Sequence, residues 1–541
     1  MTLFKLSPWL PLMVSSITKL RFNSFPFPFI RAMGSVVSCG KKGGASISGS
    51  QIEVGLPVAR AMSMSNNGDT GEIIEETVCS ESDLIDEGIK SVELSGTKIL
   101  LAKTKGNVYA IGAKCTHYGL PLENGSLCDG RIRCPFHGAC FSLKTGAAGA
   151  KCVETLRQEG FKGKIMLITA EKTIPYDRPK LSKAMHLDAD SILLRQPDFY
   201  QKANIDVKFR LKVSKVDPIT KTVLTESGES FKYDKLFLAT GGKPRNLMVP
   251  GSQLKNVFFL RTPEDANSIV NNAKGKKVVI IGSSFIGMEA ASYLVSDNRS
   301  ASVVVIGSTS APFERTLGSA VGQRIQKWFE DNGVIFKNSA KVSKLEGTDK
   351  VEKIIINDKE VIEAEVVVAG IGVVPATDYL KDTKVNLNKG GYVVVNEEMR
   401  TNVEDIYSGG DIVSFPLFLN RDSPVSIGHW QIAHKHGHVA ALNMLGKKEP
   451  FYSVPFFWTS LFGKSLRYTG YGAFDDVIIS GSLSHLTFIA YYCNGPKVVG
   501  IAEMGKAPAA ANFANYLFKG SSLMKSQVQS NGDIALKLKC E

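Results

Sequence analysis

Long apolar runs are missing from this 541-residue sequence. No window reaches the ~18 consecutive apolar residues that a membrane-spanning helix needs, so a transmembrane protein is not expected. A concentrated basic stripe is missing too. The net charge is +13, but six of the positive residues precede Glu53 and the rest are spread thinly. Nucleic acid is therefore not an expected partner, because its binding requires a clustered basic surface.

The composition also excludes a mostly disordered chain. Hydrophobic residues make up 43% and charged residues 22% of the sequence, which are globular proportions. The length fits roughly three or four domains. Only nine cysteines are present, and four of them lie close together between Cys115 and Cys140. This pattern indicates a local metal site in a reducing compartment more than a disulfide framework.

The cysteine-rich segment contains two paired motifs, Cys115-Thr116-His117 and Cys134-Pro135-Phe136-His137. Cys-x-His followed by Cys-x-x-His is the ligand set of a Rieske [2Fe-2S] centre, in which one iron takes two thiolates and the other two imidazoles. The segment 126–133 predicts a hairpin with an Asp-Gly turn that brings both motifs together. A zinc site is the alternative, but the one-residue Cys-x-His spacing is rare for zinc. The predicted metal ligands are Cys115, His117, Cys134 and His137.

A second signal follows the β-branched run that ends at Ile281. The turn reads Gly282-Ser283-Ser284-Phe285-Ile286-Gly287 and leads into a helical stretch. This is a dinucleotide-binding fingerprint in its required strand–helix context, although an ordinary tight turn is the alternative. The ribose-binding acid is expected at the end of the next predicted strand, 302–306, where Gly307 stands instead. The choice between NAD and NADP therefore stays open.

A first fingerprint is present but damaged. Gly146-Ala147-Ala148-Gly149 precedes a predicted helix, and the predicted strand 165–169 ends near Glu171, at a spacing that suits an adenosine-ribose contact. However, Lys144 replaces the first glycine of the motif. The preceding strand, 139–143, is also needed by the Rieske domain, and one strand cannot belong to two sheets.

Three further stretches carry a family resemblance: Glu154–Gly160, Pro175–Lys183 and Leu461–Tyr468. With the motifs above, the sequence from about Glu76 onward resembles the apoptosis-inducing-factor-like flavoproteins that carry a Rieske domain, which are FAD-dependent pyridine nucleotide oxidoreductases. The resemblance implies an α/β reductase with two dinucleotide-binding (Rossmann-like) domains for FAD and NAD(P). It also implies an N-terminal all-β Rieske domain, truncated here, and a C-terminal α+β interface domain.

The resemblance implies binding residues for each nucleotide. Those for FAD are Gly146, Gly149, Glu171, Arg178, Lys183, Thr240, Gly241, Asp411 and Trp458. Those for NAD(P)H are Gly282, Ser284, Gly287, Glu289 and Gly372. Lys183 and Glu289 are also candidate catalytic residues, because a preorganised charge near the flavin stabilises its reduced form. A solvated lysine and a first-turn helical glutamate are the alternatives.

The chain departs from the family pattern where Thr145-Gly146 leads straight into the FAD fingerprint. Two or three strands and a linker are missing there, so at least one cofactor domain is expected to be compromised. The predicted domains are a targeting or disordered tail and linker (1–75), the truncated Rieske domain (76–146), the first FAD-binding part without its first strand (147–265), the NAD(P)-binding domain (266–395), the second FAD-binding part (396–445) and the interface domain (446–541).

The function expected from these features is electron transfer from NAD(P)H to FAD, and then singly to the Rieske cluster or an external acceptor. The acceptor and the oligomeric state are not predicted. A non-enzymatic cell-death or scaffold protein with a disabled flavin domain is one alternative, and the reductase component of a Rieske oxygenase system is another. The flavin half has no Cys-x-x-Cys pair, so dithiol chemistry is not expected.

The N-terminal segment predicts a cellular location. Its first 32 residues are basic, apolar and free of acids, which is typical of a mitochondrial transit peptide. If translation starts at Met33, Gly34 instead begins an N-myristoylation pattern. The protein would then lie in the cytoplasm or associate with the cytosolic face of a membrane through its N-terminus.

Overall fold

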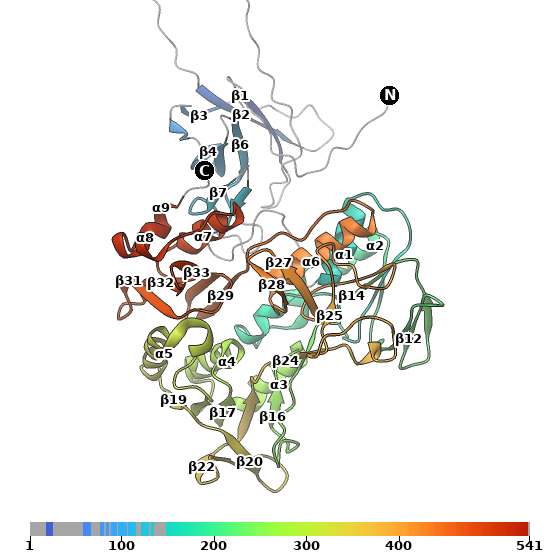
Figure 1. Cartoon of the computed structure of the whole chain (residues 1–541), viewed down its shortest axis with the longest axis vertical. Coiled ribbons are helices and arrows are strands. Elements are labelled where there is room, and N and C mark those ends of the chain that lie inside the picture. The colour runs from blue at the N-terminus through green and yellow to red at the C-terminus, as the bar shows by residue number, and fades with distance from the viewer. Residues whose placement is uncertain are drawn as a thin grey trace, which may run out of the picture. The chain divides into compact units, whose positions relative to one another are not determined.

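The chain folds into two units, each with its own core. The computed structural model describes residues 18–24, 58–65, 76–80, 83–85, 88–94, 96–104, 107–114, 121–128, 131–134 and 148–538. The first unit comprises Met1–Leu143, Ala507–Ser521 and Ile534–Glu541. The second comprises Lys144–Lys506 and Ser522–Asp533 (Figure 1). Each unit is described separately below.

The first unit contains a three-stranded antiparallel sheet of β4 (Gly88–Leu94), β5 (Thr97–Thr104) and β6 (Asn107–Gly112). The central strand β5 buries four consecutive apolar residues, 99–102, because it is covered on both faces. β7 (Ser126–Cys128) and β8 (Arg131–Arg133) form the predicted hairpin, with Cys128 opposite Arg131.

A second small sheet precedes it, in the order β1-β2-β3. β1 (Thr18–Ser24) runs parallel to β2 (Val58–Ser65), which pairs antiparallel with β3 (Glu76–Ser80). Two strands therefore lie inside the segment 1–75, for which the sequence predicts a tail and linker. Polar and apolar residues alternate in β1, and this period of two suits a strand.

The first unit also includes helices from the C-terminal end of the chain, α7 (Ala509–Phe518) and α9 (Ile534–Lys537). Asn512 of α7 donates through Nδ2 to the carbonyl oxygens of Ala535 (3.2 Å) and Leu536 (3.1 Å). These helices therefore group with the N-terminal strands and not with the rest of the predicted interface domain. The other predicted domain boundaries remain predictions.

The nucleotide-binding half of the second unit is built on a five-stranded parallel sheet, in the order β16-β23-β17-β18-β19 (Figure 1). Its strands are β16 (Val257–Phe259), β17 (Lys277–Ile281), β18 (Ser302–Ile306), β19 (Val334–Lys337) and β23 (Val366–Ala369). Its helices are α3 (Pro263–Ala273), α4 (Phe285–Val295) and α5 (Glu314–Glu330). Consecutive residues of β17 and β18 are buried, as in sheets covered on both faces. The predicted strand 302–306 is confirmed as β18.

The other dinucleotide-binding half contains two separate parallel strand pairs. β9 (Ile165–Ile168) pairs with β10 (Ile205–Lys208), and β14 (Leu236–Leu238) pairs with β26 (Ile406–Ser408). Within the residues that the structure describes, no strand joins these pairs. A Cβ atom on Gly149 would lie 3.7 Å from both Leu167 and Ala239, so the first turn of α1 (Ala148–Gln158) contacts β9 and the residue after β14.

The helix α6 (Trp430–Met444) packs closely on the start of α1. A Cβ atom on Gly437 would lie 2.1 Å from the carbonyl oxygen of Ala148, so only glycine permits this approach. The remaining elements of this half are α2 (Pro197–Lys202), β11 (Val213–Asp217), β12 (Thr222–Thr225), β13 (Ser230–Lys232), β15 (Gly242–Pro244), β24 (Val373–Pro375), β25 (Val393–Val394), β27 (Val413–Leu417) and β28 (Asn420–Val425). The strands β20 (Val342–Glu346), β21 (Lys353–Ile356) and β22 (Glu360–Glu363) form a small antiparallel sheet attached to the nucleotide-binding half.

A five-stranded antiparallel sheet completes the second unit, in the order β29-β30-β33-β32-β31. Its strands are β29 (Phe456–Leu461), β30 (Lys464–Gly470), β31 (Asp476–Ser482), β32 (Thr487–Asn494) and β33 (Lys497–Met504), and α8 (Lys525–Ser530) follows. Leu461, Tyr468 and Phe488 of this sheet share one core with Leu317 and Phe329 of α5. None of the helices in the described part of the chain is long and apolar enough to cross a membrane.

The turn between β17 and α4 generates a stability prediction. A Cβ atom on Gly287 would lie 1.9 Å from the carbonyl oxygen of Gly282, so Gly287→Ala must displace backbone. We expect a loss of about 1–3 kcal/mol in the free energy of unfolding, as for an overpacked core. Urea-induced unfolding measures it. Ser284→Ala is the matched control, because the Ser284 side chain is exposed and makes no capping hydrogen bond. Equal unfolding curves for both variants would contradict this packing.

Candidate functional site

The predicted cluster ligands fall mostly outside the described residues. Cys115, His117 and His137 lie there, as does the FAD fingerprint residue Gly146. Cys134 is described, follows β8 directly and is completely buried in the core of the first unit. A buried thiol at the end of the hairpin fits a cluster ligand, whereas the geometry of the full set stays a prediction.

The hairpin beside Cys134 is hydrogen-bonded to α7 through the buried side-chain amide of Asn515. Arg133 Nε donates to Asn515 Oδ1 at 2.7 Å, and Asn515 Nδ2 donates to Ser126 Oγ at 3.1 Å. Ser126 and Arg133 are paired opposite each other on β7 and β8. The side chain of Asn515 therefore contacts both strands of the hairpin, and its contact on β8 is with Arg133, the residue before the predicted cluster ligand Cys134. Asn515 lies 382 residues from Arg133, so no local pattern could predict the contact.

The NAD(P) fingerprint residues form one tight turn. Gly282 has a φ of +114°, and a Cβ atom there would lie 2.4 Å from the carbonyl oxygen of Gly370. Gly287 approaches Gly282, and exposed Ser284 occupies the N-cap position of α4 without a capping hydrogen bond from its side chain. Free backbone amides at a helix N-terminus suit a pyrophosphate. Gly372, with a φ of +96°, lies in the loop before β24.

The predicted catalytic residues meet in a buried ion pair. Lys183 Nζ lies 2.8 Å from Glu289 Oε2, and the two side chains are 16% and 5% exposed. Glu289 also accepts hydrogen bonds from Ser182 Oγ and, at 2.6 Å, from Thr459 Oγ1. The carboxylate thus joins the helical turn η2 (Arg178–Ser182), α4 and β29. Lys183 is therefore not a solvated surface lysine.

Two aromatic groups surround this pair. Lys183 Nζ lies 4.9 Å from the centre of the Trp458 ring, a distance at which the cation is attracted to the ring face. His429 is half-buried nearby, and its burial together with the charge of Lys183 lowers the pKa of His429 to about 4. The imidazole is therefore neutral at pH 7. Lys183, Trp458 and Glu289, assigned separately from the sequence, lie together.

A second charged network contains two of the predicted FAD residues. Arg178 Nη2 lies 2.7 Å from Glu171 Oε1, and the hydroxyl of Tyr176 donates to Glu171 Oε2 at 2.6 Å. Arg178 also donates to the carbonyl oxygen of Arg261. The Arg261 guanidinium lies 3.9 Å from Asp411 Oδ2, so it connects this network to a third predicted FAD residue.

Arg261 also lies against Gly241, which follows Thr240; both are predicted FAD-binding residues. A Cβ atom on Gly241, whose φ is +70°, would lie 2.8 Å from Arg261 Nη2. Thr240 Oγ1 donates to the carbonyl oxygen of Ala376 at 2.7 Å, and β15 pairs antiparallel with β24. Burial, and then the charge of Arg178, lowers the pKa of Arg261. Two guanidinium groups close to one another suit a phosphate-bearing ligand.

The second FAD signature, Gly409-Gly410-Asp411, follows β26. Gly410 has a φ of +80°, and a Cβ atom there would lie 3.3 Å from Ala148 at the start of α1. The Gly410 amide donates to His436 Nδ1 at 3.2 Å, and burial lowers the pKa of His436 to about 3. Neutral His436 therefore fixes the loop that carries Asp411.

Sequence reasoning misses several residues of these networks. They are Tyr176, Ser182, Arg261, Thr459 and Asn515. Tyr176 and Ser182 lie inside the Pro175–Lys183 motif, and Thr459 adjoins Trp458. These residues could therefore have been predicted as parts of the site from their neighbours in the sequence. Arg261 and Asn515 reach their partners only through the tertiary fold.

Two family models match this chain. The pyridine nucleotide-disulphide oxidoreductase model covers residues 145–437, and the Rieske [2Fe-2S] domain model covers residues 75–158. Apoptosis-inducing factor 3 of Homo sapiens is 39% identical over 523 residues, or 85% of this chain and 86% of that protein. Rubredoxin-NAD(+) reductase of Pseudomonas putida is 31% identical over 357 residues, or 64% of this chain and 91% of that protein.

Solved structures of reductases are also similar to this chain. The ferredoxin reductase for the CYP199A2 system from Rhodopseudomonas palustris has a TM-score of 0.68 and 25% identity, covering 72% of this chain and 96% of its own. The covalent putidaredoxin reductase–putidaredoxin complex has a TM-score of 0.68 and 26% identity, covering 72% of this chain and 95% of that chain.

The buried imidazole of His436 generates a pH prediction. An unfolded histidine binds a proton below about pH 6.5, whereas folded His436 stays neutral to about pH 3. Its stabilising contribution is complete above pH 6.5 and is lost as the pH falls toward 3. At pH 4 the loss is about 3 kcal/mol.

His436→Asn removes the titration but keeps an acceptor for the Gly410 amide. We expect the variant to lose less of its free energy of unfolding between pH 7 and pH 4 than the unmodified protein, as measured by urea-induced unfolding. The exposed His485 provides the control substitution, His485→Asn. An unchanged pH profile for His436→Asn would refute the assignment.

The Asn515 contact generates a prediction for the cluster unit. Asn515→Leu removes one partner each from Arg133 and Ser126, which costs about 1–3 kcal/mol when the groups are buried. We expect the visible absorption of the cluster to be lost at a lower temperature. Ser126→Ala, which removes only the weaker contact, should have a smaller effect. Identical melting of Asn515→Leu and the unmodified protein would show that α7 does not support the hairpin.

Proposed function

The chain belongs to the pyridine nucleotide-disulphide oxidoreductase family, and from this premise we propose that it passes electrons from a nicotinamide nucleotide through FAD to its own Rieske cluster. It is an NAD(P)H-dependent oxidoreductase, and its cofactors are FAD and a [2Fe-2S] cluster. The fold class predicted from the sequence is confirmed by the matching family models and by the solved reductase structures.

The proposal is carried by the position of Glu289. This residue lies on α4, less than two turns from the start of the helix at the NAD(P) fingerprint, and its carboxylate holds Lys183 beside Trp458. FAD accepts a hydride and gives up electrons singly, which allows a nicotinamide donor to serve a one-electron cluster. In our proposal Lys183 supplies fixed positive charge toward the flavin, while Ser182 and Thr459 orient Glu289.

The cysteine content supports one-electron transfer over dithiol chemistry. Residues 145–437 contain one cysteine, Cys152, and a redox-active disulfide requires two thiols. The Cys152 thiol is buried, and burial raises its pKa, so it is a poor nucleophile. Electrons that reach the flavin therefore leave to a cluster or to a separate carrier.

An external carrier is the second part of the proposal. Relatives of this chain are named as rubredoxin and ferredoxin reductases, and one solved relative is a complex with putidaredoxin. We propose a small iron–sulfur protein as an additional acceptor. A Rieske oxygenase system is one setting in which such a reductase would act. The acid-free, basic segment 1–32 supports a mitochondrial location, with membrane association through Gly34 as the alternative.

A second candidate function rests on the two separate strand pairs. The described residues supply no strand between the β9–β10 and β14–β26 pairs, and Gly146 lies outside them. If this sheet binds FAD too weakly, the chain acts as a non-enzymatic cell-death or scaffold protein. The flavin content of the purified protein separates the two candidates.

Steady-state oxidation of NADH with ferricyanide as artificial acceptor tests the first candidate. Glu289→Gln removes the charge that holds Lys183, and we expect kcat to fall about 10-fold or more, as for other losses of preorganised charge. Glu330→Gln, at the exposed C-terminal end of α5, is the control and should retain activity. Flavin content is measured in each sample. Unchanged kcat for Glu289→Gln at full flavin content would contradict the role of this pair.

A further inference from the structure

The end of β18 carries Gly307 in place of the acidic residue that dinucleotide-binding folds have there. A Cβ atom on Gly307 would lie 2.5 Å from Ser283 Oγ and 3.0 Å from Ser283 Cβ. Ser283 belongs to the fingerprint turn and is itself buried. In such folds a carboxylate at this position binds the 2′-hydroxyl of the adenosine ribose. Here Ser283 crowds the place where a side chain on residue 307 would begin, and residue 307 is a glycine.

A side-chain oxygen from the loop after β19 lies close to the position of the missing side chain on Gly307. Asn338 follows β19, and its Oδ1 atom lies 3.7 Å from the position of that Cβ on Gly307. The two loops are joined by hydrogen bonds from the Gly307 amide to the Lys337 carbonyl and from the Ala340 amide to the Gly307 carbonyl, both 2.9 Å. Asn338 therefore stands beside the missing carboxylate position on a fixed loop.

The orientation of the Asn338 amide is determined by its other contacts. Asn338 Nδ2 donates to the Ser310 carbonyl oxygen at 2.9 Å and to Gln326 Oε1 at 2.7 Å. Both partners accept, so the nitrogen must face them. The opposite atom, Oδ1, is buried and has no hydrogen-bond partner among the described residues. A buried acceptor without a donor is costly, which makes it a ready site for a ligand hydroxyl.

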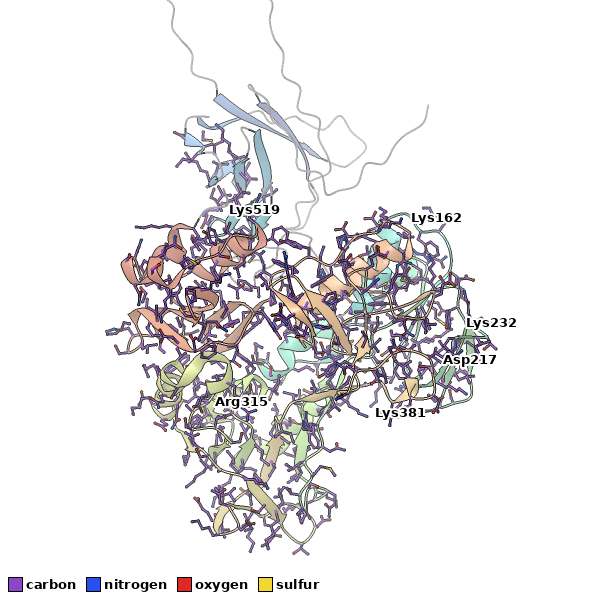
Figure 2. The ribbon with its side chains drawn as sticks, in the orientation of Figure 1. Lys162, Asp217, Lys232, Arg315, Lys381 and Lys519 are labelled. Carbon is purple, nitrogen blue, oxygen red and sulfur yellow. The ribbon has the colours of Figure 1, made fainter. Side chains whose placement is uncertain are left out.

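The charges around this place do not favour a phosphate. Glu314 accepts from the Ser310 amide at 2.8 Å and from Ser310 Oγ at 2.9 Å. Lys337 is paired with Glu360 at 2.6 Å. Arg315, in the first turn of α5, is exposed (Figure 2). A 2′-phosphate would bring negative charge toward a neutral acceptor and a carboxylate.

We propose that Asn338 is a specificity-determining residue whose Oδ1 accepts a hydrogen bond from the adenosine 2′-hydroxyl, so that the site selects NADH over NADPH. The inference rests on the nucleotide site of the proposed function and adds which nucleotide it takes. A 2′-hydroxyl supplies the donor that Oδ1 lacks, whereas a phosphate dianion supplies none.

Calorimetric titration of the purified full-length protein with NAD⁺, NADP⁺ and 2′-deoxy-NAD⁺ tests this proposal. We expect NAD⁺ to bind at least about 10-fold more tightly than NADP⁺. One neutral hydrogen bond corresponds to about a 3- to 10-fold change in Kd. The unmodified protein should therefore bind 2′-deoxy-NAD⁺ that much more weakly than NAD⁺, and Asn338→Ala should bind the two equally.

Gln326→Ala is the matched control, because it removes a partner of Asn338 Nδ2 and leaves Oδ1 in place. It should keep the preference for NAD⁺ over its 2′-deoxy analogue, and thermal unfolding confirms that each variant is folded. Continued discrimination by Asn338→Ala would overturn the proposal. Tighter binding of NADP⁺, lost in Arg315→Gln, would overturn it in favour of phosphate recognition. Binding of none of the nucleotides would instead refute the nucleotide site of the proposed function, and this inference with it.

Discussion

The candidate active site depends on the ion pair and hydrogen bonds of one buried carboxylate, that of Glu289. Its partners come from segments far apart in the sequence: Ser182 and Lys183 at one end of η2, and Thr459 on β29. Removing an ionised group from water is costly unless it is paired and hydrogen-bonded. The carboxylate therefore requires its own helix, α4, to meet both η2 and β29. The same requirement places a positive charge beside Trp458, within reach of the NAD(P) fingerprint helix.

The sequence was informative wherever function depends on local backbone geometry. The hairpin 126–133, the strand 302–306 and the glycine-rich turn at 282–287 are properties of short segments, and the structure has them. Partners such as Arg261, Asn338 and Asn515 could not be predicted, because asparagine and arginine carry no periodic signal and their contacts form only in the fold. Ligand geometry at Cys115, His117 and His137 lies outside the described residues and stays a prediction.

The two nucleotide-binding halves differ in the pairing of the strands that the structure describes. The half around β17 has five paired parallel strands, and its fingerprint turn is packed through Gly282, Gly287 and Gly370. The other half keeps the helix α1, the charged network around Glu171 and the loop of Asp411, yet its described strands form two pairs.

Anaerobic titration of the purified protein with NADH, followed by visible absorption and electron paramagnetic resonance, tests the central claim most directly. We expect the flavin absorption to bleach and the signal of a reduced Rieske cluster then to appear. A flavin spectrum that NADH leaves unchanged, although NADH binds, would contradict electron transfer through FAD, because the nucleotide would then have no route for its electrons into the chain.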